Sequence, residues 1–149
     1  MLSQEEIQNA RQLFKEYEAS LGISLCFQNF AEELASLPGK YAPPSGRLLL
    51  AFADDELAGC IALRSLDDGA CEMKRLFLRD QFRNRGLGRE LITAIINEAR
   101  SIGYKRMRLD TLPGLMDSAI KLYERFGFRD IPAYYGTPVE NTRYMELEL

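Results

Sequence analysis

The segment from Leu76 to Ile92 constrains the fold of this 149-residue chain more than any other part of the sequence. It reads LFLRDQFRNRGLGRELI: an apolar run meets three arginines, then two glycines one residue apart, then an amphipathic helix pattern. Backbone N–H groups at a helix start lack partners within the helix and carry partial positive charge. Glycines let the chain turn so that these groups converge on an anion. The segment predicts a strand–turn–helix unit that binds phosphate or pyrophosphate; the alternative is a solvated arginine-rich turn.

The candidate ligands for the anion are the residues of the turn itself: Arg83, Asn84, Arg85, Gly86, Leu87, Gly88 and Arg89. Two well-known phosphate-binding loops do not fit this turn. A nucleoside-triphosphate loop needs Gly-Lys-Ser/Thr, whereas Gly88 is followed by Arg89 and Glu90. The dinucleotide fingerprint needs a third small residue where this chain has Leu91. A different phosphate-containing ligand is therefore expected.

The spacing of apolar residues divides the rest of the chain into helices and strands. Ser3 and Glu6 form a capping box for a first helix that ends near Gly22. Further helices are expected at Phe30–Leu37, from the glycine turn to about Ser101, and at Leu115–Phe126. Strands are expected at Ile23–Phe27, Arg47–Ala53, Leu57–Leu66, Ala70–Leu78, Lys105–Asp110 and Arg143–Leu149. The segment from Lys40 to Gly46 contains two prolines and is expected to be a loop.

The order of these elements predicts an α/β fold. Three consecutive strands between Arg47 and Leu78, joined by short acidic turns, form an antiparallel meander. The strands Ala70–Leu78 and Lys105–Asp110 are joined by a helix, so their pairing is expected to be parallel. We therefore expect a mixed, mostly antiparallel sheet flanked by helices. A single domain over residues 1–149 suits this length.

Composition argues against several classes of function. A net charge of -3 disfavours a nucleic-acid-binding protein, which usually carries a basic excess. The chain has no histidine, which removes the usual base of serine and cysteine nucleophiles and most ligands for zinc, so no metal is expected. The dispersed residues Cys26, Cys60 and Cys71 suggest buried thiols in a reducing compartment. The polar N-terminus and the lack of an apolar run of roughly 20 residues predict a cytoplasmic protein with no membrane partner.

Three motifs together carry a resemblance to a known family. Arg83-Asn84-Arg85-Gly86-Leu87-Gly88 resembles the Arg/Gln-x-x-Gly-x-Gly/Ala signature of the GNAT superfamily of acetyl-CoA-dependent N-acetyltransferases. Glu72 to Leu78 is similar to the family's fourth strand, and Ala119 to Phe128 to its Ala-x-x-x-Tyr-x-x-x-Gly-Phe helix. The motifs occur in the family's order and cover about Arg47 to Phe128. The resemblance implies a GNAT-like sheet in which a parallel pair of strands splays apart.

The resemblance also implies where the cofactor lies. The pyrophosphate of coenzyme A is expected on main-chain N–H groups from Arg83 to Arg89. The pantetheine arm is expected along the strand edge at Leu76, Phe77 and Leu78, much as a peptide adds to a sheet. The N–H of Leu76 is the implied donor to the oxyanion. Asp117 lies near the position where many members carry an asparagine that touches the cofactor arm.

Two side chains are implied in proton transfer. Glu72 matches the glutamate base of some members, and a partly buried carboxylate with a raised pKa could deprotonate an amine directly or through water. The alternative for Glu72 is an ion pair with Lys74 or Arg75. Tyr123 matches the tyrosine that donates a proton to the leaving coenzyme A thiolate; the alternative is a packing residue on the core face of its helix.

The N-terminal part departs from the family pattern. Members usually open with a strand before the first helix, whereas here Ser3 already caps a helix. The family's first strand is therefore either missing or replaced by Ile23–Phe27. Either arrangement changes the acceptor side of the cleft.

The leading hypothesis is an N-acetyltransferase that moves an acetyl group from acetyl-CoA to a primary amine by direct attack in a ternary complex. The alternative is an acyl-CoA-binding sensor or regulatory module with little or no turnover, which needs the glycine turn but neither Glu72 nor Tyr123. The expected partners are acetyl-CoA and an amine whose identity the sequence leaves open, since fold does not fix substrate. A homodimer is compatible with the family.

Overall fold

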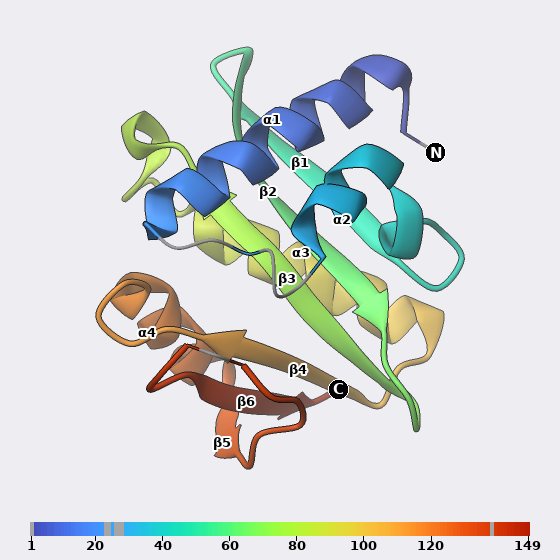
Figure 1. Ribbon diagram of the computed structural model, residues 1–149, viewed down its shortest axis with the longest axis vertical. Helices are drawn as coiled ribbons and strands as arrows, with labels where there is room; N and C mark the ends of the chain where they lie inside the picture. Colours follow the sequence, from blue (N-terminus) through green and yellow to red (C-terminus); the bar gives the residue numbers. More distant parts are fainter. Residues whose placement is uncertain (1, 23–24, 26–28, 138) are drawn as a thin grey trace.

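A twisted six-stranded sheet forms the centre of the computed structural model, which describes residues 2–22, 25, 29–137 and 139–149 (Figure 1). Its strand order is β1-β2-β3-β4-β6-β5. The strands are β1 (Arg47–Ala53), β2 (Glu56–Ser65), β3 (Ala70–Leu78), β4 (Arg106–Thr111), β5 (Arg129–Ile131) and β6 (Arg143–Glu148). All neighbouring pairs are antiparallel except β3 and β4, which are parallel. The predicted mixed sheet is confirmed.

Helices cover both faces of the sheet (Figure 1). On one face lie α1 (Gln4–Leu21) and α2 (Phe30–Ser36), whose apolar side chains form a core with Leu48, Ala62 and Phe77 of the first three strands. On the other face lie α3 (Leu87–Ile102) and α4 (Asp117–Phe126). Their apolar stripes pack on buried residues of every strand from β2 to β6 except β5. The sheet is therefore held between two separate cores.

The helix ends are set by residues that the sequence already marks. Ser3 and Glu6 form the reciprocal capping box at the start of α1, as predicted. Gly103 and Gly127 end α3 and α4 in left-handed conformations, with φ of 109° and 99°. The N–H of Phe128 then donates to the carbonyl of Tyr123 at 3.0 Å and brings the Phe128 ring back onto the helix.

The parallel pair is short, and this shortness opens the sheet. β3 and β4 pair only over Ala70–Glu72 and Arg106–Arg108. Beyond Glu72, the strand β3 continues to Leu78 along β2, with a register shift opposite Ile61. At that shift Arg75 has a φ of 62°, which identifies a β-bulge. The expected splay between the two parallel strands is confirmed, and both strand ends face the gap.

Several boundaries differ from the sequence expectations. Helix α4 begins at Asp117 rather than Leu115, because Leu112 to Met116 form a turn of their own. The short strand β5 was not predicted, and a 3-10 turn at Gly39–Tyr41 overlaps the start of the expected loop. The expected strand Ile23–Phe27 lies outside the described residues, apart from Leu25. In the described part of the chain, no helix has the length and apolarity to span a membrane.

Candidate active site

The glycine turn lies at the start of α3, where the sequence places it. Gly86 is the N-cap residue with a φ of 80°, and Asn84 is also left-handed with a φ of 62°. No side chain caps this helix end. The first hydrogen bond of the helix joins the N–H of Glu90 to the carbonyl of Gly86 at 3.1 Å. Among the described residues, no acceptor meets the N–H groups of Leu87, Gly88 and Arg89, so these donors are available to an anion.

The two glycines of the turn serve different purposes. A Cβ atom added to Gly86 would meet nothing within 4 Å, so its requirement for glycine comes from its left-handed backbone. A Cβ atom added to Gly88 would lie 3.4 Å from Leu122 and 3.6 Å from Leu78, in ordinary contact between helix and sheet. Gly86 therefore shapes the turn, whereas a Cβ at Gly88 would fit between Leu122 of α4 and Leu78 of β3 without a clash.

Arginine side chains surround the turn on its exposed side. Arg85 pairs with Asp54 at 3.1 Å, and Arg83 pairs with Asp80 at 3.3 Å. The Nε of Arg83 also donates to the carbonyl of Leu78 at 3.2 Å, which ties the turn to the end of β3. These exposed ion pairs are weak and can open when an anionic ligand arrives.

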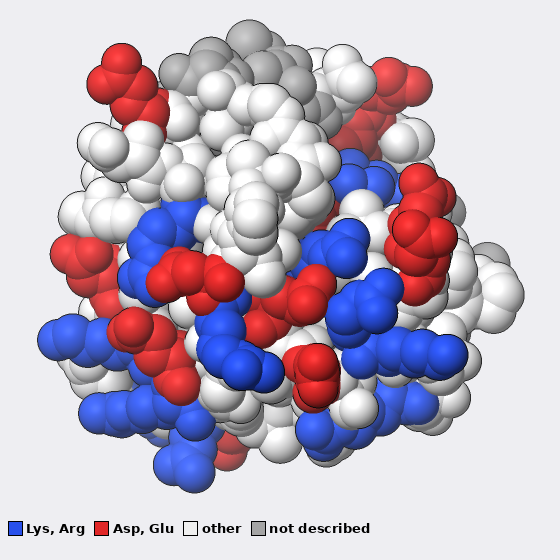
Figure 2. All heavy atoms as spheres, turned by 90° about the horizontal axis from the view of Figure 1, so that it is seen from below, with Lys and Arg blue, Asp and Glu red and all other residues white. Residues whose placement is uncertain are grey.

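Five arginines lie within fifteen residues of the sequence, at positions 75, 79, 83, 85 and 89, but the structure separates them. Arg75 is buried and makes a two-bond ion pair with Glu33, at 2.9 and 3.1 Å. Arg79 makes a similar pair with Glu16 of α1, with two contacts of 2.9 Å. Only Arg83, Arg85 and Arg89 remain at the turn. On the end of the molecule shown in Figure 2, acidic and basic side chains are also intermixed.

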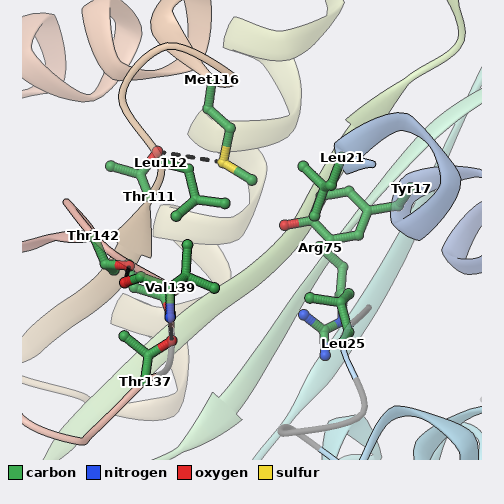
Figure 3. Close-up of a pocket in the computed structure, with 11 residues that line it drawn as sticks. Tyr17, Leu21, Leu25, Arg75, Thr111, Leu112, Met116, Thr137, Val139 and Thr142 are labelled. Atoms are coloured by element: carbon green, nitrogen blue, oxygen red, sulfur yellow. Dashed lines mark hydrogen bonds between the residues drawn. The ribbon is translucent and has the colours of Figure 1, made fainter. Parts of the chain in front are cut away.

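A small cavity lies at the splay between β3 and β4, under α1 (Figure 3). The side chains that line it come from four parts of the chain: Tyr17, Leu21, Leu25, Arg75, Asp110, Thr111, Leu112, Met116, Thr137, Val139 and Thr142. Figure 3 shows the Tyr17 hydroxyl directed into the space between α1 and the segment that holds Leu112 and Met116. Burial raises the pKa of Tyr17 to about 12 and keeps its hydroxyl protonated. The sequence reasoning missed this lining, because it is assembled from distant segments.

Glu72 is present on β3 but is enclosed by partners. Its carboxylate accepts a hydrogen bond from Tyr134 at 2.6 Å and one from Arg64 at 2.7 Å, and Lys74 lies 3.8 Å away. Burial alone would raise the pKa of Glu72, but Lys74, Arg64 and the hydrogen bonds outweigh it and lower the pKa. The expectation of a raised pKa is therefore wrong. With 1% exposure, Glu72 fits the ion-pair alternative.

Tyr123 lies on the opposite side of the sheet from Glu72, in the core beneath α4. Its ring packs against Phe128 with a centroid distance of 5.7 Å. Burial strongly raises the pKa of its hydroxyl, with smaller contributions from Tyr17 and Asp110. Tyr123 is therefore protonated at neutral pH.

Asp117 begins α4, and its side chain is used locally. Its carboxylate accepts a hydrogen bond from the N–H of Gly114 at 2.8 Å. This bond stabilises the turn before the helix. A contact from Asp117 to a cofactor would have to compete with it.

The end of β3 lies next to the start of α3, since a Cβ on Gly88 would be 3.6 Å from Leu78. The edge of Leu76–Leu78 that faces away from β2 carries no strand partner in the described chain. It runs toward the free N–H groups of α3, and the cavity lies beside it. The described residues contain no group of three or more histidine, cysteine, aspartate and glutamate side chains able to hold a metal ion.

Comparisons with known proteins identify the family of this chain. The model of the acetyltransferase (GNAT) family matches residues 8–128. An uncharacterized N-acetyltransferase of Schizosaccharomyces pombe is 40% identical over 97% of this chain and 90% of its own length. A GNAT-family acetyltransferase from Staphylococcus aureus superposes with a TM-score of 0.81 at 19% identity, over 99% of this chain and 95% of that one.

A third similar protein was solved with a ligand. A GNAT-family acetyltransferase from Elizabethkingia anophelis, with acetyl-CoA bound, is 27% identical with a TM-score of 0.59, over 70% of this chain and 77% of that one. The family match spans most of the chain, including the bulged strand, the glycine turn and helix α4. This chain is an acyltransferase and belongs to the acetyltransferase (GNAT) family.

Proposed function

We propose that this protein transfers an acetyl group from acetyl-CoA to a primary amine by direct attack in a ternary complex. The observation that carries the proposal is the pair of free backbone sites at this end of the sheet: among the described residues, the N–H groups of Leu87, Gly88 and Arg89 have no acceptor, and the outer edge of Leu76–Leu78 has no strand partner. A helix start of this kind binds phosphate groups, and a free strand edge binds an extended amide-containing arm. The acetyl-CoA-bound relative supports the same ligand.

In this proposal the cofactor lies along the residues that the family motifs mark. The pyrophosphate binds the backbone from Arg83 to Arg89, and the pantetheine arm follows Leu76, Phe77 and Leu78. The backbone N–H of Leu76, one residue after the bulge at Arg75, donates to the oxyanion of the tetrahedral intermediate. Asp117 lies at the start of α4 and adds a contact to the cofactor if its bond to Gly114 opens.

Tyr123 is the proposed proton donor to the coenzyme A thiolate. Its hydroxyl is protonated at neutral pH because burial raises its pKa. A thiolate released beside it can take this proton as the C–S bond breaks. Glu72, in contrast, is held by Arg64, Lys74 and Tyr134, and we assign it a positioning role on β3.

The test is release of free thiol from acetyl-CoA in the presence of a defined panel of amines: glycinamide, putrescine, phenethylamine, lysine and the dipeptide Ala-Gly. The proposal predicts amine-dependent thiol release with at least one member. Binding of acetyl-CoA without amine-dependent release would favour the sensor or regulatory module instead. If the protein neither binds acetyl-CoA nor releases thiol, both functions are contradicted.

A further inference from the structure

Asp110 occupies a distinctive place at the end of β4. It lies two residues beyond Arg108, the last residue of β4 that pairs with β3. Its neighbours Leu109 and Thr111 are buried, and Leu109 belongs to the core under α3 and α4. Because side chains alternate along a strand, Asp110 points to the opposite face, which carries α1. There it is half-buried and lines the cavity at the splay.

Asp110 and Tyr123 therefore approach the gap between β3 and β4 from opposite faces of the sheet. Tyr123 belongs to the core formed by α3 and α4, whereas Asp110 shares its cavity with Tyr17 of α1. The negative charge of Asp110 makes a small contribution to the raised pKa of Tyr123, after burial and Tyr17. A thioester inserted along the open edge of β3 would lie between a carboxylate on one face and a phenol on the other.

The surroundings of Asp110 set its protonation. Charged and titratable groups face it from every neighbouring element: Glu72, Lys74 and Arg75 on β3, Arg108 on β4, Tyr144 and Glu146 on β6, Tyr17 on α1, Tyr123 on α4, and Tyr134 in the loop before β6. Burial raises the pKa of Asp110, and Glu72 adds to this, while Lys74 and Arg75 oppose it. A carboxylate with a raised pKa is a better base near neutral pH than an ordinary one.

Glu72 lacks the features that Asp110 has. Each of its oxygens already accepts a hydrogen bond, from Arg64 or from Tyr134, and its pKa is lowered. It does not line the cavity, whereas Asp110 does. The hydrogen bonds of Glu72 and the position of Asp110 in the cavity lining therefore favour Asp110 as the base, independently of the pKa values.

We propose that Asp110 is the catalytic base that takes the proton from the acceptor amine in the cavity beside Tyr17 and Thr111. This inference rests on the proposed N-acetyltransferase function. The ammonium group of the acceptor loses one proton to the Asp110 carboxylate, directly or through water. The neutral amine attacks the thioester carbonyl, so that a C–N bond forms and the C–S bond breaks.

The remaining protons balance within the site. The thiolate takes a proton from Tyr123, and the second proton lost by the attacking nitrogen returns to the Tyr123 oxygen. The proton held by Asp110 passes to solvent. The sum is one amide, one thiol and one released proton for each ammonium and acetyl-CoA consumed.

The test compares four variants, two at Asp110 and one each at Glu72 and Asp130, with the panel amine that gives the wild type its highest kcat/KM. Asp110→Asn is expected to lower kcat about 100-fold or more, the usual contribution of a general base, while its affinity for acetyl-CoA is retained. The kcat/KM of the wild type falls as pH drops through the pKa of Asp110, and this acid limb is expected to vanish in Asp110→Asn. The control Asp130→Asn removes a carboxylate that pairs with Arg143 on the surface, and wild-type rates are expected.

Chemical rescue separates a missing base from a damaged fold. In Asp110→Gly, added formate is expected to restore part of kcat, because a small carboxylate can enter the space of the lost side chain. Wild-type kcat in Asp110→Asn would overturn the assignment and leave the acetyltransferase function standing. A larger loss in Glu72→Gln, with loss of the acid limb in that variant alone, would assign the base to Glu72. No thiol release by the wild type would end both proposals.

Discussion

At the scale of single residues, the hydroxyl of Tyr123 offers a sharp test of the proposed chemistry. Tyr123→Phe removes the proton donor while it keeps the ring that packs on Phe128. We expect kcat to fall about 100-fold, at the lower end of the range for general acid catalysis, with an unchanged dissociation constant for acetyl-CoA. The matched control is Tyr104→Phe, which removes a hydroxyl that donates to the Ser45 carbonyl. Equal kcat in both variants would show that Tyr123 only packs in the core and does not donate the proton.

The buried pair of Glu33 and Arg75 supports the bulge of β3. The Glu33 carboxylate also accepts a hydrogen bond from Tyr41 and lies 3.3 Å from Lys40. Glu33→Ala leaves the Arg75 guanidinium buried without its carboxylate, and we expect a loss of about 3–5 kcal/mol in the free energy of unfolding. Urea denaturation measures this, with the exposed neighbour Glu32→Ala as control. A loss no greater than that of the control would contradict the supporting role.

The same pair makes stability depend on pH in a defined direction. Burial raises the pKa of Glu33, but Arg75, Lys40 and Tyr41 outweigh it, and the pKa lies below its ordinary value of 4.5. The stability from Glu33 is present above that ordinary value and is lost as pH falls through the lower folded value. The unfolding free energy of Glu33→Gln is expected to fall less steeply than that of the wild type below pH 4.5.

Some of the site residues could be predicted from the sequence and others could not. The turn residues Gly86 and Gly88 and the helix residue Tyr123 could be placed because each belongs to a local pattern. Arg75 looked like one more basic residue beside the turn, and only its partner Glu33, far away in the chain, shows that it is buried. Asp110 was missed because its character depends on the splay of the strands, which no local spacing reveals.

At the scale of the elements, the start of α3 can be compared with its own end. Gly86 and Gly103 are both left-handed, and a Cβ atom on either would meet nothing within 4 Å. An alanine at either position costs about 1–2 kcal/mol in backbone strain. Only Gly86→Ala disturbs the N–H groups proposed to hold pyrophosphate. We expect Gly86→Ala to weaken acetyl-CoA binding in calorimetry, whereas Gly103→Ala binds as the wild type does; equal affinities in both would contradict the cradle.

Most elements could be predicted because their signals are local. The capping box of α1, the apolar runs of β1 to β3 and the apolar stripe of α3 each need only neighbouring residues. The strand β5 has three residues, too few for a period to show, and it exists because β6 offers an edge to pair with. The turn from Leu112 to Met116 similarly depends on the position of β4.

At the scale of the whole molecule, the proposed site joins both cores. It uses β3 and β4 at the splay, α3 and α4 on one face and α1 on the other. Only the folded chain brings these elements together, so acetyl-CoA should bind the native state alone. At a ligand concentration of about 100 times the dissociation constant, we expect the free energy of unfolding to rise by about 2.7 kcal/mol. Urea unfolding with and without acetyl-CoA measures this, and unchanged midpoints would count against a site at the splay.

The central claim is that the glycine turn and the open edge of β3 form one binding site for acetyl-CoA. Isothermal titration of the purified protein with acetyl-CoA, coenzyme A and ADP tests it most directly. Because ADP carries adenosine and pyrophosphate but no pantetheine arm, we predict that acetyl-CoA and coenzyme A bind and that ADP binds more weakly. If ADP binds as tightly as acetyl-CoA, the edge of β3 does not contribute to binding. Absence of binding by all three would contradict the account and reduce the segment RNRGLGRE to a solvated arginine turn.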